Sequence, residues 1–304
     1  MQAMRWKMVG ALAGAGMLVG WLSGIAGAEP LIGSEAPRVT PRSSVLVKSP
    51  RAILGRGYTA ESVLLKDLAT GHTLYEFRSD QRLSPASLTK IMSALVILEY
   101  GRLHDHVMIS PRAAAAHKIR LRLRFGQVFR LEDLMKAMLI TSANDACLAA
   151  VEHVGGSESR FVFLMNQKAR VLGLTDTHFS NACGFDAPDH YSTAADLARL
   201  SEIALQHPLF RSFVKEELQV MTAVNVPRTY FLRNTNRLLG RIPGVEGVKT
   251  GFTSQAGRCL IAKVSQDGKE LLLVLLHANR RWTIATNLIN YGLQRPVAAG
   301  TLLR

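Results

Sequence analysis

A serine and a lysine three residues apart, Ser87 and Lys90, form a pair that could do chemistry in the stretch SPASLTKIM. Residues at this spacing are neighbours on one face of a helix, so a helix that begins near Ser87 brings its hydroxyl beside the lysine amine. A serine hydroxyl is a weak nucleophile that needs an adjacent base, and a neutral lysine amine can act as one. The competing interpretation is a simple helix start, because serine is a common N-cap.

Two further motifs follow Ser87 and Lys90 in the chain. The stretch TSANDA carries Ser142 and Asn144 between two predicted helices, and VKTGFT carries Lys249 on a predicted strand. The order S-x-x-K, S-x-N and K-T-G is typical of penicillin-binding proteins and serine β-lactamases. Each motif alone is weak evidence, but the three together, in this order and in these contexts, are a strong signal.

The similarity extends well beyond the three motifs. The chain resembles the D-alanyl-D-alanine carboxypeptidases among the low-molecular-mass penicillin-binding proteins, through SPASLTKIMSALVILE, MNQKARVLGLTDTHFSN, YSTAADLA and VEGVKTGFTSQAGRCLI. This resemblance implies a serine-type carboxypeptidase or D,D-endopeptidase that cleaves peptidoglycan stem peptides in cell-wall biogenesis and cell shape. It also implies covalent inhibition by β-lactam antibiotics, and it requires neither a cofactor nor a metal ion.

The resemblance assigns catalytic roles to the first two motifs. Ser87 is expected to be the nucleophile and Lys90 its base, with Ser142 passing a proton to the leaving amine and Asn144 holding the substrate backbone. Burial and the nearby charge of Lys249 are both expected to lower the pKa of Lys90, which allows the amine to act as a base.

The third motif is expected to bind substrate. Lys249 and Thr250 would hold the terminal carboxylate of the peptide, and Gly251 would let the substrate lie close along the strand. The backbone amides of Phe252 and Ser87 would together form an oxyanion hole for the tetrahedral intermediate.

The chain departs from the carboxypeptidase pattern before the K-T-G motif. Many carboxypeptidases have an arginine there that approaches the substrate carboxylate, whereas this chain has Thr235. Either Arg233 or Arg237 takes over that contact, or the free carboxylate is not the preferred feature and the enzyme cuts cross-links as a D,D-endopeptidase.

A second departure is the stretch IRLRLRF, whose strict alternation predicts a strand. Its arginines, Arg120, Arg122 and Arg124, would then share one face. Two interpretations remain for this face: it binds the extra carboxylates of a cross-linked wall peptide, or it is simply solvated.

The elements that must position these residues alternate between strand and helix signals. Hairpins are predicted over residues 62–77 and 258–278 and a strand over 244–252, with helices over 87–101, 131–140, 145–156, 159–173, 191–208 and 281–293. Strands therefore occur near both ends, with helices between them. This order predicts an α+β fold (an α/β sandwich) of the serine β-lactamase and D,D-transpeptidase type. Its antiparallel sheet is built from both chain ends, with a helical lobe inserted.

The N-terminal residues have the features of an export signal. Arg5 and Lys7 precede a glycine-rich apolar run and small residues, which predicts a signal peptide over residues 1–28. An uncleaved membrane anchor is the alternative. Residues 29–57 read as a flexible linker and residues 58–304 as the catalytic domain. The expected location is the periplasm or cell-wall space, including a peripheral position at the membrane.

The chain is strongly basic, with a net charge of +14. A basic exported protein is attracted to anionic wall polymers, whereas nucleic acid is excluded as a partner by export and by the lack of a binding motif. His104 and His106 beside Asp105 are interpreted as a surface turn, and no spacing indicates a metal site.

Three cysteines, Cys147, Cys183 and Cys259, remain to be explained. A chain of this length can bury a full core without disulfides, so we expect three free, buried thiols. The less favoured alternative is a bridge between Cys147 and Cys183.

Two other functions share these motifs. A class A β-lactamase needs a glutamate to deacylate the enzyme, and the region TDTHFSNACGFDAPDH, where it should occur, contains none. We therefore expect slow release of penicillin. A non-catalytic penicillin-binding or wall-binding protein is the second alternative, although every side chain needed for acylation is present.

Overall fold

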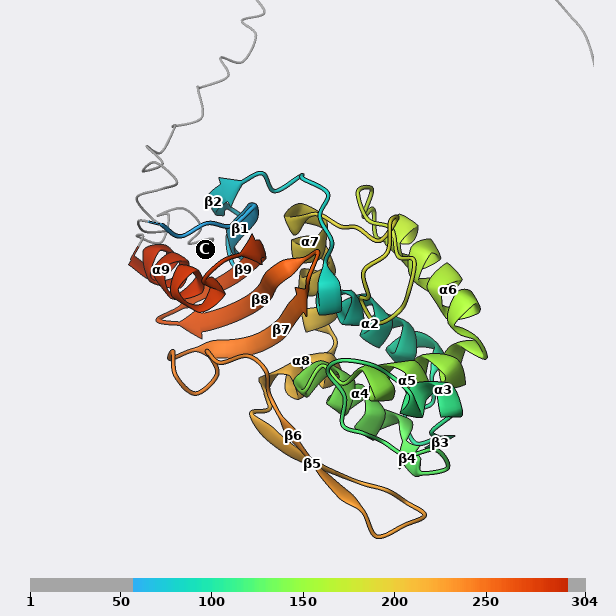
Figure 1. The fold of residues 1–304 in the computed structure, drawn as a ribbon. Helices are drawn as coiled ribbons and strands as arrows, with labels where there is room; N and C mark the ends of the chain where they lie inside the picture. Colours follow the sequence, from blue (N-terminus) through green and yellow to red (C-terminus); the bar gives the residue numbers. More distant parts are fainter. Residues whose placement is uncertain (1–56, 295–304) are drawn as a thin grey trace, which may run out of the picture. The chain divides into compact units, whose positions relative to one another are not determined.

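The computed structural model describes residues 57–294, whose centre is a five-stranded antiparallel sheet (Figure 1). The strand order is β2-β1-β9-β8-β7. The strands are β1 (Ser62–Asp67), β2 (Thr73–Phe77), β7 (Val245–Thr253), β8 (Gly257–Gln266) and β9 (Lys269–Ala278). The two predicted hairpins and the predicted strand are confirmed. Since β1 pairs directly with β9, the sheet joins segments that are about two hundred residues apart in the chain.

Helices cover both faces of this sheet. Strand residues alternate between the faces, so Leu271, Leu273 and Leu275 pack with Ile284 and Leu288 of α9 (Arg281–Gln294) in one apolar cluster. The alternate residues of the same strands face a larger cluster that the remaining helices share. The central strands are therefore buried on both sides, which explains their near-continuous apolar sequences.

The helical lobe lies between β2 and β7 in the chain. Its elements are η1 (Ala86–Thr89), α2 (Lys90–Tyr100), α3 (Pro111–Ala114), α4 (Leu131–Ile140), α5 (Asn144–Gly155), α6 (Glu158–Val171), α7 (Ala194–Gln206) and α8 (Pro208–Lys215). Side-chain caps stabilise the first turn of several helices. The Thr193 hydroxyl accepts a hydrogen bond from the Asp196 amide at the start of α7, and the Ser157 hydroxyl accepts one from the Arg160 amide at the start of α6. The α+β architecture and the inserted helical lobe agree with the prediction.

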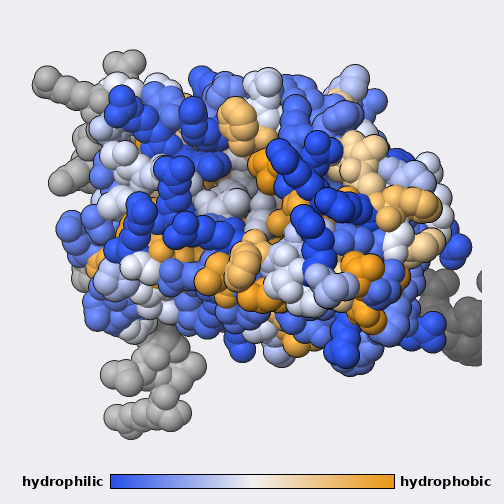
Figure 2. Space-filling model, turned by 60° about the horizontal axis from the view of Figure 1, so that its bottom comes forward, coloured by the Kyte–Doolittle hydropathy of each residue, from blue (hydrophilic) through white to orange (hydrophobic). Residues whose placement is uncertain are grey.

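Two small two-stranded sheets lie outside the central sheet. Strand β3 (His106–Met108) pairs with β4 (Val128–Arg130), and β5 (Leu218–Thr222) pairs with β6 (Thr229–Arg233). The face in Figure 2 is dominated by hydrophilic residues with smaller apolar groups among them, as the basic composition leads one to expect. Within residues 57–294, no helix is long and apolar enough to cross a membrane. The predicted signal peptide, almost all of the predicted linker and the last ten residues lie outside the described residues.

The strand predicted for IRLRLRF is wrong. Residues 118–125 form an irregular loop in which Leu123 is buried and the arginines are exposed, but Ile119 and Phe125 are exposed as well, so the alternation of burial is incomplete. The amides that would have joined a ladder donate instead to the Asp145 carboxylate, from Leu121 at 3.2 Å and Leu123 at 3.0 Å. Arg122 also has a φ of 62°, which lies in the left-handed region and interrupts a strand.

The prediction of three free thiols is also wrong. Cys147 and Cys183 form a disulfide, and Cys259 is the free, buried cysteine. The two cysteines are 36 residues apart in sequence, but α5 packs against the loop after α6, so their Cα atoms lie 6.1 Å apart. The prediction was based on domain size, since a domain this large does not need a disulfide for stability. Domain size does not indicate whether tertiary packing brings two cysteines together.

Candidate active site

Ser87 lies in a single 3₁₀ turn, η1, that leads directly into α2. Because the helix continues from Lys90, the two side chains fall on one face, and the Lys90 Nζ lies 3.1 Å from the Ser87 Oγ. Ser87 is largely buried, at 8% exposure, and Lys90 is completely buried. The structure therefore brings together the pair that the sequence singled out.

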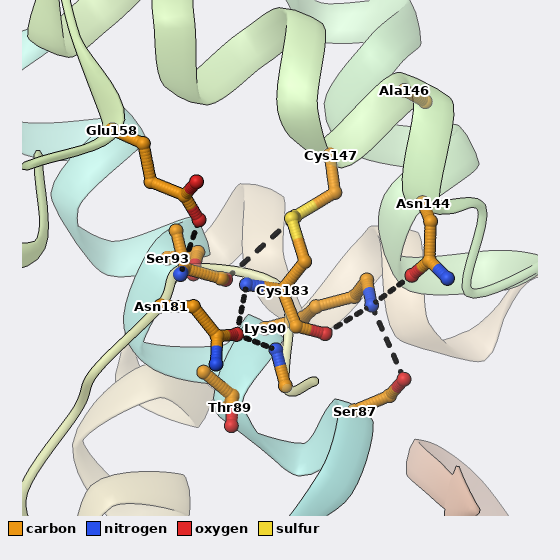
Figure 3. Close-up of a disulfide and its surroundings, with 12 residues drawn as sticks. Ser87, Thr89, Lys90, Ser93, Asn144, Ala146, Cys147, Glu158, Asn181 and Cys183 are labelled. Atoms are coloured by element: carbon orange, nitrogen blue, oxygen red, sulfur yellow. Dashed lines mark hydrogen bonds between the residues drawn. A yellow bond between two sulfur atoms is a disulfide. The ribbon is translucent and has the colours of Figure 1, made fainter. Parts of the chain in front are cut away.

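The Lys90 amine has two further partners in addition to Ser87 (Figure 3). Its Nζ lies 2.9 Å from the Asn144 Oδ1 and 2.6 Å from the carbonyl oxygen of Cys183. Both of these oxygens can only accept hydrogen bonds. A neutral amine has two N–H groups and one lone pair, so the two acceptors use both N–H groups and the lone pair is left facing the Ser87 hydroxyl.

The electrostatic setting favours that neutral form of Lys90. Burial lowers the pKa of its amine from the usual 10.5 to about 7. None of the three groups that contact the Lys90 Nζ is a carboxylate. A base is most effective when its pKa is near the working pH, so this amine is suited to taking a proton from a serine hydroxyl.

The second motif occupies the short connection between α4 and α5. Asn144 begins α5 and is held by its own amide: the Nδ2 donates to the His117 carbonyl oxygen at 3.1 Å, while the Oδ1 accepts from Lys90. Ser142 has a φ of 63°, and its Oγ is buried without a hydrogen-bond partner among the residues around it. Its predicted proton-transfer role stays a prediction. An unsatisfied buried hydroxyl in a left-handed backbone is a feature that is common at functional sites.

The third motif lies on β7, which is an edge strand of the five-stranded sheet. Gly251 is packed against the turn that carries the nucleophile: a Cβ there would lie 3.1 Å from both the Pro85 carbonyl oxygen and the Ala86 Cβ. Glycine therefore allows the edge strand to approach η1 closely. Its exposed edge can pair with an extended peptide, which would then lie across Ser87.

Lys249 is a buried lysine without an ion-pair partner among the described residues. It is 1% exposed, and its Nζ donates to the Thr250 carbonyl oxygen at 3.1 Å. Burial, together with the charges of Lys90 and Arg281, holds its pKa well below the usual value. Among residues 57–294, it has no carboxylate partner. A buried cation without an anion is costly, and a carboxylate-bearing ligand would relieve this cost.

A cleft is lined by residues of the first two motifs and by the residues that directly follow K-T-G. Ser87, Asn144, Phe252 and Thr253 contribute to it, as do Lys118 and Ile119 of the irregular loop. Phe252 is half-exposed, at 52%. Its amide stays the predicted second donor of the oxyanion hole, together with that of Ser87. Arg120, Arg122 and Arg124 do not line this cleft, although they belong to the same loop.

The family model for D-alanyl-D-alanine carboxypeptidase matches residues 48–280, which include all three motifs and the cleft between them. The chain belongs to this family. Together with the antiparallel sheet and its helical lobe, this match confirms the resemblance that the motifs indicated.

Individual relatives point to the same family. The chain is 36% identical over 227 residues to the D-alanyl-D-alanine carboxypeptidase DacF of Bacillus subtilis (strain 168), covering 73% of this chain but only 58% of that relative. It is 30% identical over 225 residues to a D-alanyl-D-alanine endopeptidase of Pseudomonas aeruginosa (strain PAO1), covering 73% of this chain and 72% of the relative. Both specificities therefore occur among the relatives.

A solved structure supports the fold. Penicillin-binding protein D2 from Listeria monocytogenes, in its ampicillin-bound form, superposes with a TM-score of 0.69 at 28% identity. The superposition covers 79% of this chain and 100% of that one.

In this member of the carboxypeptidase family, three features of the site were missed by sequence reasoning. The Cys183 carbonyl is a backbone group and has no sequence signal. Gly184 packs against the nucleophile's turn, since a Cβ there would lie 2.0 Å from the Ala86 carbonyl oxygen, and its position after Cys183 in NACGF was the available hint. Arg281 donates to the Gly251 carbonyl oxygen at 2.8 Å and to that of Cys259 at 3.0 Å, which ties β7 and β8 to the start of α9.

Among residues 57–294, no group of three or more His, Cys, Asp or Glu side chains could hold a metal ion.

Proposed function

We propose that this protein is a serine D,D-peptidase that cleaves D-Ala-D-Ala bonds of peptidoglycan stem peptides through an acyl-enzyme on Ser87. The observation that carries the proposal is the environment of the Lys90 amine. Two acceptors take its N–H groups, its pKa is lowered to about 7, and Ser87 lies 3.1 Å away.

The proposed reaction follows from these contacts. Lys90 takes the hydroxyl proton while the Ser87 Oγ attacks the carbonyl carbon of the penultimate D-alanine. The amides of Ser87 and Phe252 stabilise the resulting oxyanion, each by about 3 kcal/mol in acyl-transfer enzymes generally. The tetrahedral intermediate collapses to an ester as its C–N bond breaks. Ser142 donates its hydroxyl proton to the departing amine and takes back the proton that Lys90 holds, so the lysine is neutral again. Water then hydrolyses the ester and regenerates the serine.

Substrate would be held by the β7 edge. Lys249 is the buried lysine on this strand that interacts electrostatically with Lys90, and it would pair with the terminal carboxylate, with the Thr250 hydroxyl as a second donor. Asn144 uses its Oδ1 for Lys90 and one Nδ2 hydrogen for His117, so a single amide hydrogen remains for the substrate backbone.

A direct test is incubation of the protein with a muropeptide that ends in D-Ala-D-Ala, followed by mass spectrometry. The proposal predicts loss of one alanine residue, which Lys249→Ala should slow by raising KM. A shortened product that appears equally fast with Ser87→Ala would contradict the proposal, since that variant lacks the nucleophile.

A specific feature favours cross-linked peptides as substrates. Beside the Thr235–Thr250 pair, a cavity is lined by Arg233, Arg237, Arg241 and Arg281, together with one acid, Glu217. Among the described residues, none of these four arginines has an ion-pair partner. Burial of Arg281, with repulsion from nearby arginines, lowers the pKa of its guanidinium to about 10. We propose that this basin receives the departing side of the substrate, where a cross-linked peptide would place its additional carboxylates.

The arginines of this basin and the arginines of the irregular loop can be tested separately for a contribution to cross-link cleavage. We propose that cross-linked dimers are cleaved at least as well as free pentapeptides when both are offered at equal concentration. The double variant Arg233→Gln/Arg237→Gln should reduce dimer cleavage by about tenfold or more, because even one lost charge-assisted contact of about 1.5 kcal/mol corresponds to about tenfold. The matched control Arg122→Gln/Arg124→Gln removes two exposed arginines from the loop. A larger effect in the control, or rapid removal of terminal D-alanine with dimers untouched, would contradict this preference.

Penicillin is proposed to acylate Ser87 and to leave slowly, which separates this protein from β-lactamases. The loop that should carry a deacylating glutamate has Asp186 near the cleft, but its carboxylate accepts a hydrogen bond from the Thr253 hydroxyl. An adduct that turns over within seconds would favour the β-lactamase alternative.

We also propose that residues 1–28 direct export and that the basic mature chain associates with anionic wall polymers. Without Arg5 and Lys7, and with no acid before Glu29, the net charge falls from +14 to +12. The test is cell fractionation with N-terminal mass analysis. Recovery of the full-length chain from the cytoplasm would contradict export, and retention on isolated walls that persists at high salt would contradict charge-driven binding.

A further inference from the structure

The Cys147–Cys183 disulfide joins two segments that both contact the proposed base. Cys147 lies on α5, one turn after Asn144, whose Oδ1 is 2.9 Å from the Lys90 Nζ. Cys183 supplies a carbonyl oxygen 2.6 Å from the same nitrogen. Figure 3 shows the disulfide beside Lys90, with the hydrogen bonds to both segments converging on the amine.

The two segments differ in how firmly the backbone holds them. Asn144 is the first residue of a helix, whereas residues 181–187 are without helix or strand. The Asn181 Oδ1 accepts from the amides of Gly184 at 2.8 Å and Phe185 at 2.9 Å, and Ser93 donates to the Ala182 carbonyl oxygen at 2.5 Å. These bonds shape the turn, but the disulfide is the covalent link between it and α5.

The Cys183 carbonyl decides where the Lys90 lone pair points. If this oxygen moves away, one N–H of the neutral amine loses its acceptor and the amine is free to rotate. The Ser87 hydroxyl then becomes one of several partners rather than the group that faces the lone pair. A displacement of about 1 Å in a catalytic group can reduce a rate by about a hundredfold.

Three other titratable groups belong to the surroundings of Lys90 and its neighbouring loop, and two of them, Asp186 and His190, share that loop with Cys183. Lys249 lies on β7, and its ammonium repels that of Lys90. His190 lies near Lys90 in the same long loop as Cys183, and burial lowers its pKa to about 4, so it is neutral in the working range. Asp186 also belongs to this loop and is bound to Thr253. Since burial is the cause of the lowered pKa of Lys90, a loosened loop that admits water would raise that pKa.

We infer that the Cys147–Cys183 disulfide is a positioning element of the active site, which holds the Cys183 carbonyl against Lys90 and thereby aims the amine at Ser87. The inference rests on the proposed acyl transfer. Its role is indirect, because neither sulfur contacts the nucleophile in the described contacts.

The test compares acylation by a fluorescent penicillin across pH 5.5–9.5 for the wild type and for Cys147→Ala/Cys183→Ala. We expect the acylation rate of the double variant at pH 7 to be lower than that of the wild type by a factor of about ten or more. We also expect the midpoint of its pH profile to move upward, so that the deficit is smaller at pH 9 than at pH 6. A disulfide that only stabilised the fold would not move this midpoint.

Two controls separate positioning from stability. Val151→Ala removes a buried side chain one turn after Cys147 on α5 and should lower the unfolding temperature while leaving the midpoint in place. The second control breaks the disulfide without removing any side-chain atoms at the bridge. In a Cys259→Ala background, a dithiol reductant transfers two electrons and two protons to the disulfide, which gives two thiols and the oxidised reductant. Alkylation and intact mass then count the reduced fraction. Acylation should fall in proportion to that fraction.

The outcomes are distinct. A wild type that does not react with penicillin overturns the proposed function, and this inference with it. A wild type that reacts, with the same rate and midpoint in the double variant or in the fully reduced protein, overturns the inference alone. A midpoint that also moves in Val151→Ala overturns it as well, since the shift would then follow stability.

Discussion

The hydroxyls of Thr235 and Thr250 lie 2.7 Å apart, so the residue that replaces the expected arginine is directly bonded to the K-T-G motif. Thr235 thus orients the Thr250 hydroxyl, which is proposed to bind the substrate carboxylate. A small polar residue at this position also leaves space beside Arg281, which lines the same cavity as Thr235.

The first prediction concerns this threonine pair. Thr235→Val keeps the shape but removes the hydroxyl, so the Thr250 hydroxyl loses its partner. We expect KM for a D-Ala-D-Ala peptide to rise about fivefold, corresponding to about 1 kcal/mol for one hydrogen bond, with kcat within about twofold. The matched control is Thr222→Val, which breaks the 3.2 Å hydroxyl pair between Thr222 and Thr229 on the β5–β6 hairpin. Equal KM values for the two variants would show that Thr235 has no part in binding.

The second prediction concerns the pH dependence of acylation. Lys90 acts in its neutral form, and its pKa is lowered to about 7, so the rate should rise with pH through about 7 and approach a plateau above about 8. The Lys90→Arg variant keeps the positive charge, but a guanidinium does not deprotonate, and it should fail across the whole range. Stopped-flow labelling with penicillin measures both. A Lys90→Arg protein within a few-fold of the wild type would mean that the lysine supplies only charge.

The third prediction concerns His190, which supports the nucleophile's turn. Its Nδ1 accepts from the Ser180 amide at 3.0 Å, and its Nε2 lies 2.8 Å from the Thr89 hydroxyl, which itself donates to the Ala86 carbonyl oxygen. The Nε2–H must therefore donate, and the ring must be neutral.

Burial lowers the pKa of His190 from 6.5 to about 4, so the unfolded chain takes up the proton at a higher pH than the folded one. The free energy of unfolding should be fully retained above about pH 6.5 and should fall, by roughly 3 kcal/mol, as the pH drops to 4. Urea unfolding at several pH values measures this slope. It should be shallower in His190→Gln but unchanged in His104→Gln, whose side chain is exposed. Identical slopes in all three proteins would refute the assignment.

Much of the fold could be predicted because its signals are local. The Asp267-Gly268 turn between two apolar runs predicts the β8–β9 hairpin, and both residues have positive φ values in the structure. The threonine before α7 and the short connection around Asn144 likewise mark element boundaries. For the site, the order of three motifs selected Ser87, Lys90 and Lys249 as candidates, because each belongs to a short contiguous pattern; their roles stay predictions.

The features that could not be predicted depend on contacts between distant segments. The alternation in residues 119–125 favours a strand, yet Asp145 accepts the amides of that stretch and prevents a ladder. The disulfide arises from the packing of α5 on the loop after α6. The Cys183 carbonyl is a backbone group that every residue has, so no residue type in the sequence predicts its role.

The most direct test of the whole account is the intact mass of the protein after brief exposure to benzylpenicillin, with peptide mapping of the adduct. The account predicts one covalently bound penicilloyl group, located on Ser87, in the wild type. It predicts none in Ser87→Ala, whose fold should be intact because only one hydroxyl is removed. An adduct at unchanged stoichiometry in Ser87→Ala, or a folded wild type that stays unmodified, would contradict the account.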